Sequence, residues 1–375
     1  MGLLRLYSKD KNIFLSLTIS SLFTLAMLCQ TATASEERYG ASFMETFNST
    51  EGNGMGESTT FYSVGARSLN NNPAGLVFLN GSELLINFYR YPRTEAFIMK
   101  ENDAGNWMDY GKYDIEPFEM NSISYALGLG KIGNIGLSFA LNHKGRFIRV
   151  NKDGKAVNSF PNDDMLVTFG YGHNLFGGVS FGFDIKSIRS KILFNDKNEI
   201  GRTSIMNVGL MHQMGNRARA GVSLQNIGKD LSYNVPDIPS KIRRRILVGG
   251  MYDLVENRKN RLSISMDFSP PFENGLRYYT GAEFSYLQLL SVRLGYINNI
   301  ETYYNPLVNL ANGEVGNEER LWIRKGLTFG LGASIKGNKI NFALMPYRKP
   351  DLNSDEKLRI EEKGYINSFS FSREF

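Results

Sequence analysis

The sequence contains very little cysteine, histidine or tryptophan. Its 375 residues include one cysteine, three histidines and two tryptophans. Cys29 lies in an amino-terminal leader, so the rest of the chain has no thiol for a disulfide or a thiolate metal site. His143, His173 and His212 fall in three separate predicted strands, and none has neighbouring ligands at metal-binding spacing. The sequence therefore predicts neither a metal site nor a cofactor.

Charge and catalytic motifs are also sparse. Lysine and arginine exceed aspartate and glutamate by only six, and by four once Arg5, Lys9, Lys11 and Asp10 of the leader are removed. Such a small excess gives no reason to expect a nucleic-acid partner. "GLGKIG" matches a dinucleotide fingerprint in letters, but another strand follows it where the fingerprint requires a helix. No nucleophile or acid–base pair stands out, so we predict no catalytic residues.

The first 34 residues have the layout of a secretory signal peptide. Basic residues precede the apolar run "IFLSLTISSLFTLAML", and Ala32-Thr33-Ala34 stands before Ser35. The alternative is a membrane anchor, but the run is shorter than the roughly 20 residues that span a bilayer. We therefore predict export, with residues 35–81 forming a polar, glycine- and asparagine-rich amino-terminal segment.

From Ser82 onward the dominant pattern is strict alternation of apolar and polar residues. "GGVSFGFDIKS" places Val179, Phe181, Phe183 and Ile185 on one face and polar or small residues on the other. Fourteen such stretches can be identified. We predict strands at 82–91, 119–129, 134–149, 164–173, 178–194, 202–214, 218–232, 243–254, 259–268, 277–288, 291–304, 326–336, 339–348 and 364–375.

The connections between these stretches alternate between short and long. The short ones include "GKIG", "NLFG" and "MGN", whereas "NKDGKAVNSFPNDD" and residues 305–325 are long. This layout is typical of outer-membrane barrels, with short periplasmic turns and longer outer loops. A soluble barrel or a pair of β-sandwiches is the alternative, but neither explains the asymmetry of the loops. We predict an all-β fold: a transmembrane antiparallel β-barrel of about 14 strands at 82–375, preceded by a short hatch within 35–81.

The last predicted strand, "GYINSFSFSREF", extends this reasoning to partners. Phe369, Phe371 and Phe375 share one face and would contact outer-membrane lipid, while serines occupy the other face. An aromatic strand of this kind resembles the signal that barrel assembly machinery recognises. We therefore predict these three phenylalanines as an assembly signal and a bacterial outer membrane as the location.

One segment resembles a known family. "GARSLNNNPAGLVFLNG" is similar to the hatch of FadL-like outer-membrane proteins, in which Asn-Pro-Ala-Gly-Leu precedes the first barrel strand. "GVSLQNIGKDLSYNVPDIPSKIRRRILVGGMYDL" and "ENGLRYYTGAEFSYLQLLSVRLGY" resemble the PorV/PorQ branch of that superfamily. The resemblance covers about residues 61–375 and implies a fourteen-stranded barrel with a plug. Relatives usually have a longer segment between "GAR" and "NPAG", so the hatch here is abbreviated.

The hatch motif Asn72, Pro73, Ala74 and Gly75 also has a physical reading. Pro73 fixes its own φ and favours extended geometry at Asn72, and Gly75 can adopt positive φ. The motif is then either a rigid corner of a plug or an ordinary turn before a strand. The residues alone leave both open.

Two functions follow from the resemblance. The first is transport of hydrophobic small molecules of the long-chain fatty-acid type, with a lumen pocket at Leu247, Met251 and Tyr279. The alternative is a component of the type IX secretion system that handles exported cargo proteins. The basic run "KIRRR" (241–245) could contact anionic headgroups or acidic cargo, but we interpret it as a solvated rim.

Overall fold

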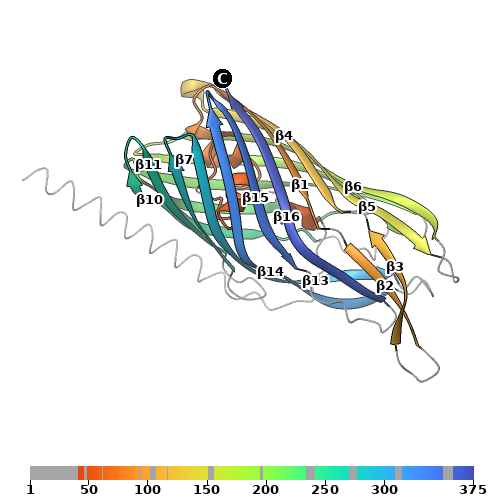
Figure 1. The fold of residues 1–375 in the computed structure, drawn as a ribbon. Helices are drawn as coiled ribbons and strands as arrows, with labels where there is room; N and C mark the ends of the chain where they lie inside the picture. Colours follow the sequence, from red (N-terminus) through yellow and green to blue (C-terminus); the bar gives the residue numbers. More distant parts are fainter. Residues whose placement is uncertain are drawn as a thin grey trace, which may run out of the picture.

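The protein is a closed antiparallel β-barrel with a plug inside it, as shown by a computed structural model (Figure 1). Fourteen strands form the barrel, so the predicted fold class is confirmed. The structure describes residues 41–45, 49–60, 62–92, 94–101, 107–115, 117–150, 156–194, 197–233, 241–269, 277–308, 315–348 and 358–375. The predicted signal peptide at 1–34 lies outside the described residues.

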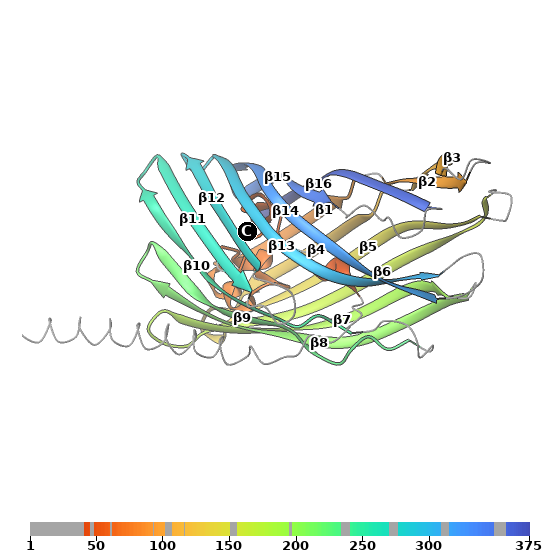
Figure 2. The ribbon, with the colours of Figure 1, turned by 90° about the horizontal axis from the view of Figure 1, so that it is seen from below.

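Each barrel strand pairs with its neighbour in the sequence, except where β1 passes directly to β4, and β16 returns to β1 to close the cylinder (Figure 2). The barrel strands are β1 (Ser82–Arg90), β4 (Glu119–Gly128), β5 (Asn134–Val150), β6 (Ala156–Asn174), β7 (Val179–Phe194), β8 (Lys197–Met214), β9 (Ala218–Gly228), β10 (Arg245–Glu256), β11 (Asn260–Ser269), β12 (Arg277–Tyr286), β13 (Leu290–Val308), β14 (Val315–Ile335), β15 (Asn338–Arg348) and β16 (Leu358–Glu374).

The closing seam joins β1 to the last residues of β16. Phe88 lies opposite Phe369 in the register, and their ring centroids are 6.3 Å apart. Ser82 N donates to Phe375 O at 3.2 Å, and Phe375 N donates to Ser82 O at 2.9 Å. No strand edge is therefore left open at the seam, which is the condition for a sheet to sit in hydrocarbon.

Burial is reversed relative to a soluble protein. On β16, Ser368, Ser370 and Ser372 are at most 1% exposed, whereas Phe369 and Phe375 are 41% and 64% exposed. The same division continues around the sheet, with leucine, isoleucine and phenylalanine outside and asparagine, serine, aspartate and arginine inside. An outer surface this apolar needs amphiphile or lipid to cover it. The wall thus has a lipid-compatible exterior and a polar lumen.

The two ends of the barrel differ. At the short-turn end, strands are joined by residues 129–133, 175–178, 215–217, 257–259, 287–289 and 336–337, and Phe375 lies beside Ser82 at this end. Towards the opposite, long-loop end, β13 and β14, with 19 and 21 residues, are among the longest strands. A transmembrane strand needs only about 9–11 residues. These two strands therefore continue well beyond the apolar belt, by which we mean the band of exposed apolar side chains on the outer face of the barrel.

No strand was predicted between those at 82–91 and 119–129, but the segment between β1 and β4 is not a single loop. It contains a hairpin of β2 (Thr94–Glu101) and β3 (Trp107–Ile115). β2 pairs with the first residues of β16, and the hairpin extends from the long-loop end (Figure 1). Because it lies beyond the barrel wall, the hairpin leaves the barrel strand count unchanged.

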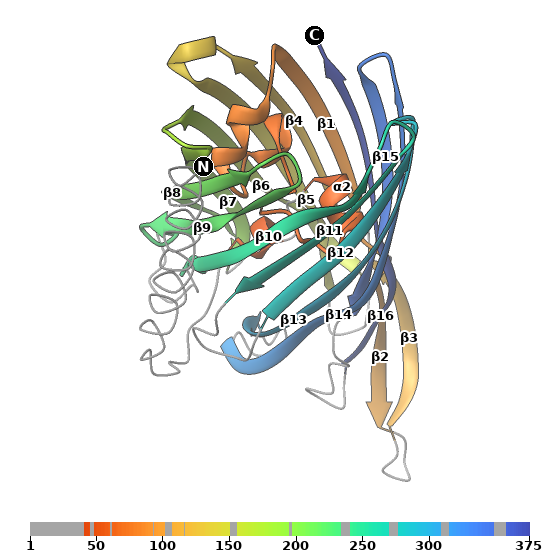
Figure 3. The ribbon, with the colours of Figure 1, turned by 90° about the vertical axis from the view of Figure 1, so that its left-hand side faces the viewer.

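A plug fills the lumen (Figure 3). We define the plug as described residues 41–45, 49–60 and 62–80, all preceding β1. It contains four short helices: η2 (Ser42–Glu45), α2 (Thr50–Gly54), η3 (Gly65–Ser68) and η4 (Pro73–Phe78); a further short helix, η5 (Gly130–Ile132), lies in the β4–β5 turn. None of the helices in the described ranges is long and apolar enough to cross a membrane.

Candidate functional site

The plug contacts the barrel wall through glycines. Gly281 and Gly295 face each other across β12 and β13. A Cβ atom on Gly295 would overlap the backbone of Met55 and Gly56, and one on Gly281 would overlap the Met55 carbonyl. These two positions therefore have room only for glycine, because the plug backbone lies directly on the wall.

A second glycine pair supports the hatch motif. Gly182 and Gly209 are register partners on β7 and β8. A Cβ on Gly182 would overlap the Pro73 carbonyl carbon, and one on Gly209 would overlap the Asn72 side-chain oxygen. The hatch motif therefore lies against the inner wall of the barrel, inside the lumen.

The local structure of the motif differs in one respect from the predicted one. Asn72 is extended at φ −124° and ψ 97°, and its Oδ1 accepts from Ala74 N at 3.2 Å, which caps η4. Gly75 is not among the positive-φ residues. A Cβ on Gly75 would instead come within 2.6 Å of Ser63 O. Close approach of two plug segments, and not backbone conformation, requires the glycine.

The residues just before the motif are held by amide and hydroxyl groups and one lysine ammonium of β6 to β9. Thr168 donates to Asn70 Oδ1 at 2.6 Å, and Lys186 and Asn207 both donate to Asn70 O at 3.3 Å. Ser223 and Gln225 each donate to Asn71 O at 2.8 Å. We call these seven residues the amide anchor: Asn70, Asn71, Thr168, Lys186, Asn207, Ser223 and Gln225.

On the other side of the lumen the plug is held by charges. Arg67 lies 3.1 Å from both Glu51 and Glu83, and Asn341 donates to Glu51 Oε1 at 3.0 Å. The backbone of Ala66 donates to Glu83 Oε2 at 2.8 Å. Burial acts to raise the pKa of the Glu51 carboxyl, but Arg67 and Arg293 outweigh it, so this pKa lies below its ordinary value.

A second ion pair extends this network. Arg293 Nε donates to Glu283 Oε2 at 2.6 Å, and Tyr62 OH donates to the same oxygen at 2.6 Å. Arg293 also donates to Asn341 Oδ1 at 3.0 Å, which joins both ion pairs. We call this network the ionic anchor: Glu51, Tyr62, Arg67, Glu83, Glu283, Arg293 and Asn341. Buried pairs of this kind are costly to break because the remaining charge stays in the lumen.

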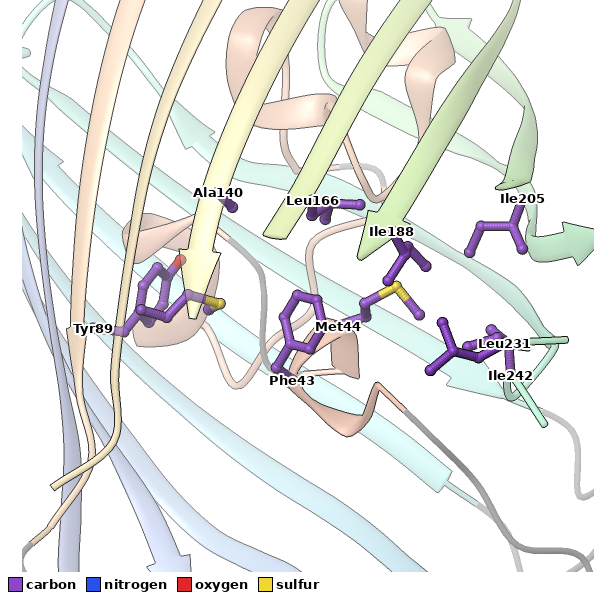
Figure 4. Packing of buried hydrophobic residues seen from close by; sticks show 10 residues of the cluster. Phe43, Met44, Tyr89, Ala140, Leu166, Ile188, Ile205, Leu231 and Ile242 are labelled. Atoms are coloured by element: carbon purple, nitrogen blue, oxygen red, sulfur yellow. The ribbon is translucent and has the colours of Figure 1, made fainter. Parts of the chain in front are cut away.

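An apolar cluster lies in the lumen beyond these contacts (Figure 4). Ala140, Leu166 and Ile188 form a register row across β5, β6 and β7. Phe43 and Met44 of the plug pack onto the cluster and are 6% and 8% exposed. We call this cluster the apolar chamber: Phe43, Met44, Tyr89, Met120, Ala140, Leu166, Ile188, Ile205, Leu231 and Ile242.

The three predicted pocket residues do not form one pocket. Leu247 and Tyr279 pack with Ile297 in a separate buried cluster. Met251 instead lines a cavity of about 270 Å³ near the short-turn end. All three face the lumen, and each is at most 6% exposed.

The basic run at 241–245 is not simply a solvated rim. Arg243 and Arg245 are 6% and 9% exposed, and Ile242 belongs to the apolar chamber. Arg244 is exposed and donates to Gly228 O at 3.3 Å. The solvated-rim interpretation is therefore wrong for two of the three arginines, because alternation along the strand entry turns them inward.

The histidines remain apart. His143 Nδ1 lies 2.6 Å from Asp163 Oδ1, and His173 stacks on Tyr171. Within the described residues, no three His, Cys, Asp or Glu side chains gather in a way that could hold a metal ion.

The wall glycines and the apolar chamber were missed by sequence reasoning. Glycines recur at the lumen parity of neighbouring strands, as in "YGHN", "GFDI" and "LGYI", and this recurrence was a usable signal. A polar face interrupted by glycine indicates a close backbone partner. The chamber has no such signal, because each of its barrel strands contributes a single apolar residue to a polar face and the other members come from the plug and from the segment between β9 and β10.

Comparison with known proteins yields a fold likeness. No protein-family profile matches the sequence, and no curated protein matches it significantly. The toluene transporter TodX of Pseudomonas putida has a TM-score of 0.54 at 14% identity, covering 92% of this chain and 100% of that one. A FadL homologue of Pseudomonas aeruginosa has a TM-score of 0.52 at 12% identity, covering 88% and 98%. The Ralstonia pickettii toluene transporter TbuX has a TM-score of 0.50 at 14% identity, covering 88% and 98%. This chain therefore shares the fold of these proteins.

Proposed function

We propose that this protein is a bacterial outer-membrane channel for hydrophobic small molecules of the long-chain fatty-acid type. The observation that carries the proposal is the apolar chamber, which places ten buried apolar side chains inside an otherwise polar lumen. Solved proteins of the same fold carry names such as toluene transporter and FadL homologue, which supports the same class of solute.

The exposed apolar belt supports a position within a membrane. The short-turn end would face the periplasm and the long-loop end the cell exterior, as in other barrels of this layout. A solute arriving from outside would then meet the chamber before it met α2, η3 and η4 of the plug. Apolar pockets with a few polar groups are the usual form of small-molecule sites.

In this structure the chamber is occupied by the protein's own side chains. Phe43 and Met44 pack where an acyl chain or aromatic ring would bind. Burying an apolar side chain of this size is worth roughly 1.5–3 kcal/mol, so a hydrophobic solute could replace them at little net cost. Solute passage further requires movement of the plug, because α2, η3 and η4 fill the lumen behind the chamber.

The decisive experiment is binding of a fluorescent fatty acid to purified protein in detergent. We expect saturable binding that Leu166→Ala weakens about tenfold, because the chamber loses buried apolar contacts. Leu247→Ala is the matched control, since Leu247 is also a buried lumen leucine but lies outside the chamber. No saturable binding to a folded wild-type barrel would remove the proposal.

A second candidate function is handling of exported proteins, as in the PorV/PorQ branch. The observation favouring it is the set of strands that continue past the apolar belt, β13 and β14 above all, together with the β2–β3 hairpin. These elements would offer a protein-binding surface outside the membrane. Crosslinking in cells tests it: recovery of only assembly factors would count against this function.

We also propose that Phe369, Phe371 and Phe375 act as a signal for barrel assembly machinery. Phe369 and Phe375 project from the outer face of β16, where a partner could contact them before the seam closes. Replacing Phe375 and Phe369 by serine should lower the amount of folded barrel in the membrane. Normal yield of heat-modifiable barrel in both variants would overturn this role.

A further inference from the structure

The short-turn end contains a cavity with an excess of arginine. The cavity has a volume of about 270 Å³ and lies between the plug and strands β8 to β11. Arg217, Arg219 and Arg261 line it, and Asp253 is the carboxylate among its lining residues. Three guanidinium groups facing one carboxylate make this end of the lumen electropositive.

The single carboxylate is already engaged. Arg261 donates to both oxygens of Asp253 at 3.0 Å, and Ser263 donates to Asp253 Oδ1 at 2.6 Å. Arg217 lies 3.9 Å from Glu256, a pair in which both side chains are about half exposed. Such a pair contributes little, because water screens it. Arg261 and Ser263 therefore supply the side-chain hydrogen bonds to this aspartate, and Arg219 donates none to it.

Arg219 is the arginine without an acidic partner. Its side chain projects into the lumen from β9, and its guanidinium carbon lies 5.3 Å from the centre of the Phe78 ring. Among the described residues, no carboxylate lies within ion-pair distance of Arg219. A guanidinium held over an aromatic ring keeps its in-plane donors available for an anion.

An apolar cavity adjoins the cationic one. It has a volume of about 390 Å³, and its wall shares Phe78 and Gln213 with the first cavity. Its remaining lining comes from the β6–β7 turn and includes Leu175, Phe176 and Val179. The two cavities together present a positive end and an apolar end on either side of Phe78.

We propose that these joined cavities bind an amphipathic carboxylate, with the head group at Arg219 and Arg217 and the apolar tail along Phe78 toward Leu175 and Val179. The proposal rests on the proposed transport function and extends it by assigning a last binding station at the short-turn end. A guanidinium and a carboxylate match in geometry, so a charged head group is preferred over an alcohol. Inorganic phosphate satisfies the arginine but leaves the apolar cavity empty.

The test is photo-crosslinking of purified, folded protein with a diazirine analogue of decanoate, followed by mass spectrometry of the labelled peptides. We expect label on peptides containing Phe78 or residues 175–179. Decanoate should compete at least tenfold better than decanol, and better than hexanoate or inorganic phosphate. Arg219→Gln should weaken labelling at least tenfold, and Arg219→Lys should restore part of it.

The matched control is Arg258→Gln, which removes the same charge from an exposed turn at the same end of the barrel. It should leave labelling unchanged. Phe176→Ser should weaken competition by decanoate several-fold but leave competition by hexanoate unchanged, because only the longer tail reaches the second cavity. Should Arg219→Gln fail to fold, Arg219→Lys and the competition series still decide the question.

Equal competition by decanol and decanoate, or labelling unaffected by both Arg219 variants, would overturn the inference. The outcome is separable from that of the proposed function. Binding of an uncharged hydrophobic probe that depends on Leu166 but not on Arg219 would support transport without this station. Labelling at Phe78 in a protein that binds no such probe would leave the anion site in place and remove the transport proposal.

Discussion

The plug is held on its two sides by different chemistry. The ionic anchor holds residues 49–67 against the wall through the buried Arg67–Glu83 ion pair and through hydrogen bonds to charged groups. The amide anchor holds residues 70–72 mainly through neutral donors to backbone carbonyls. Ion pairs depend on protonation and on both partners being present. Neutral hydrogen bonds and glycine contacts depend on shape. One side of the plug therefore depends chiefly on buried charges, whereas the other depends chiefly on the fit of neutral groups, with Lys186 as the charged donor in the amide anchor.

The largest effect is expected from a side chain on a wall glycine. Gly295→Val would place methyl groups where Met55 and Gly56 now lie, and neither backbone can give way. We expect complete loss of hydrogen-exchange protection in plug residues 49–60, with the amide-anchor side less affected. Ser291→Val is the control, since Ser291 is on the same strand and face but contacts Ser285. Retained protection would mean that the plug does not rest on this glycine.

Arg67→Gln should produce the next largest effect. It leaves Glu51 and Glu83 buried without their cation, which costs about 3–5 kcal/mol for a buried pair. Hydrogen exchange measured by mass spectrometry should show that opening of plug residues 49–60 becomes easier by this amount. Arg90→Gln is the control, because the Arg90–Glu119 pair is 59% and 44% exposed and should change stability by less than about 1 kcal/mol.

Acidification should then weaken the ionic anchor more than the amide anchor. The pKa of Glu51 is lower in the folded protein than its ordinary value of 4.5. Its stabilising contribution is therefore complete above that value and is lost as the pH falls through the lower, folded pKa. Exchange protection, corrected for intrinsic rates, should fall in residues 49–60 as the pH is lowered below 4.5 and should persist better in residues 69–79. Equal loss on both sides would contradict the division between the anchors.

The smallest effect is expected from Ser223→Ala on the amide-anchor side. The variant removes one of two donors to Asn71 O, and Gln225 still donates to that oxygen. We expect the free energy of opening of residues 69–79 to fall by about 1 kcal/mol. Ser223→Ala combined with Gln225→Leu should exceed the sum of the single variants, because the carbonyl then has no donor from β9.

The strands were predictable where lipid enforces alternation and less so beyond it. The stretch predicted at 178–194 is β7 at Val179–Phe194, because the period-two pattern is local. β14 begins at Val315 and not at 326, and β6 begins at Ala156 and not at 164. A strand that extends beyond the membrane meets water on both faces, so its sequence need not alternate between apolar and polar residues. Its backbone pairing with the neighbouring strand can still continue. The same reason hid the β2–β3 hairpin within the predicted loop.

The candidate site was only partly predictable. The hatch motif could be identified from "NPAG", but its position on Gly182 and Gly209 depends on contacts more than a hundred residues away. Arg67 and Glu83 are close in the sequence, but they meet only because the chain turns back into the barrel. The alternation of side chains along each strand placed Leu247, Met251 and Tyr279 on the inner face. Alternation does not give a residue's position along the barrel axis, so the separation of Met251 from the other two could not be predicted.

The direct link between the plug and β1 constrains the order of assembly. Only Gly81 separates the plug from Ser82 at the seam, and a Cβ on Gly81 would overlap the Phe375 carbonyl. Once the barrel has closed, the connection between the plug and β1 is too short for the plug to be inserted from outside. The sheet must therefore curl around a core that is already folded beneath its first strand. Residues 49–80 would thus act as a template around which the sheet closes. Circular permutants that move them to the carboxyl terminus should form barrels without a plug or with a shifted strand register.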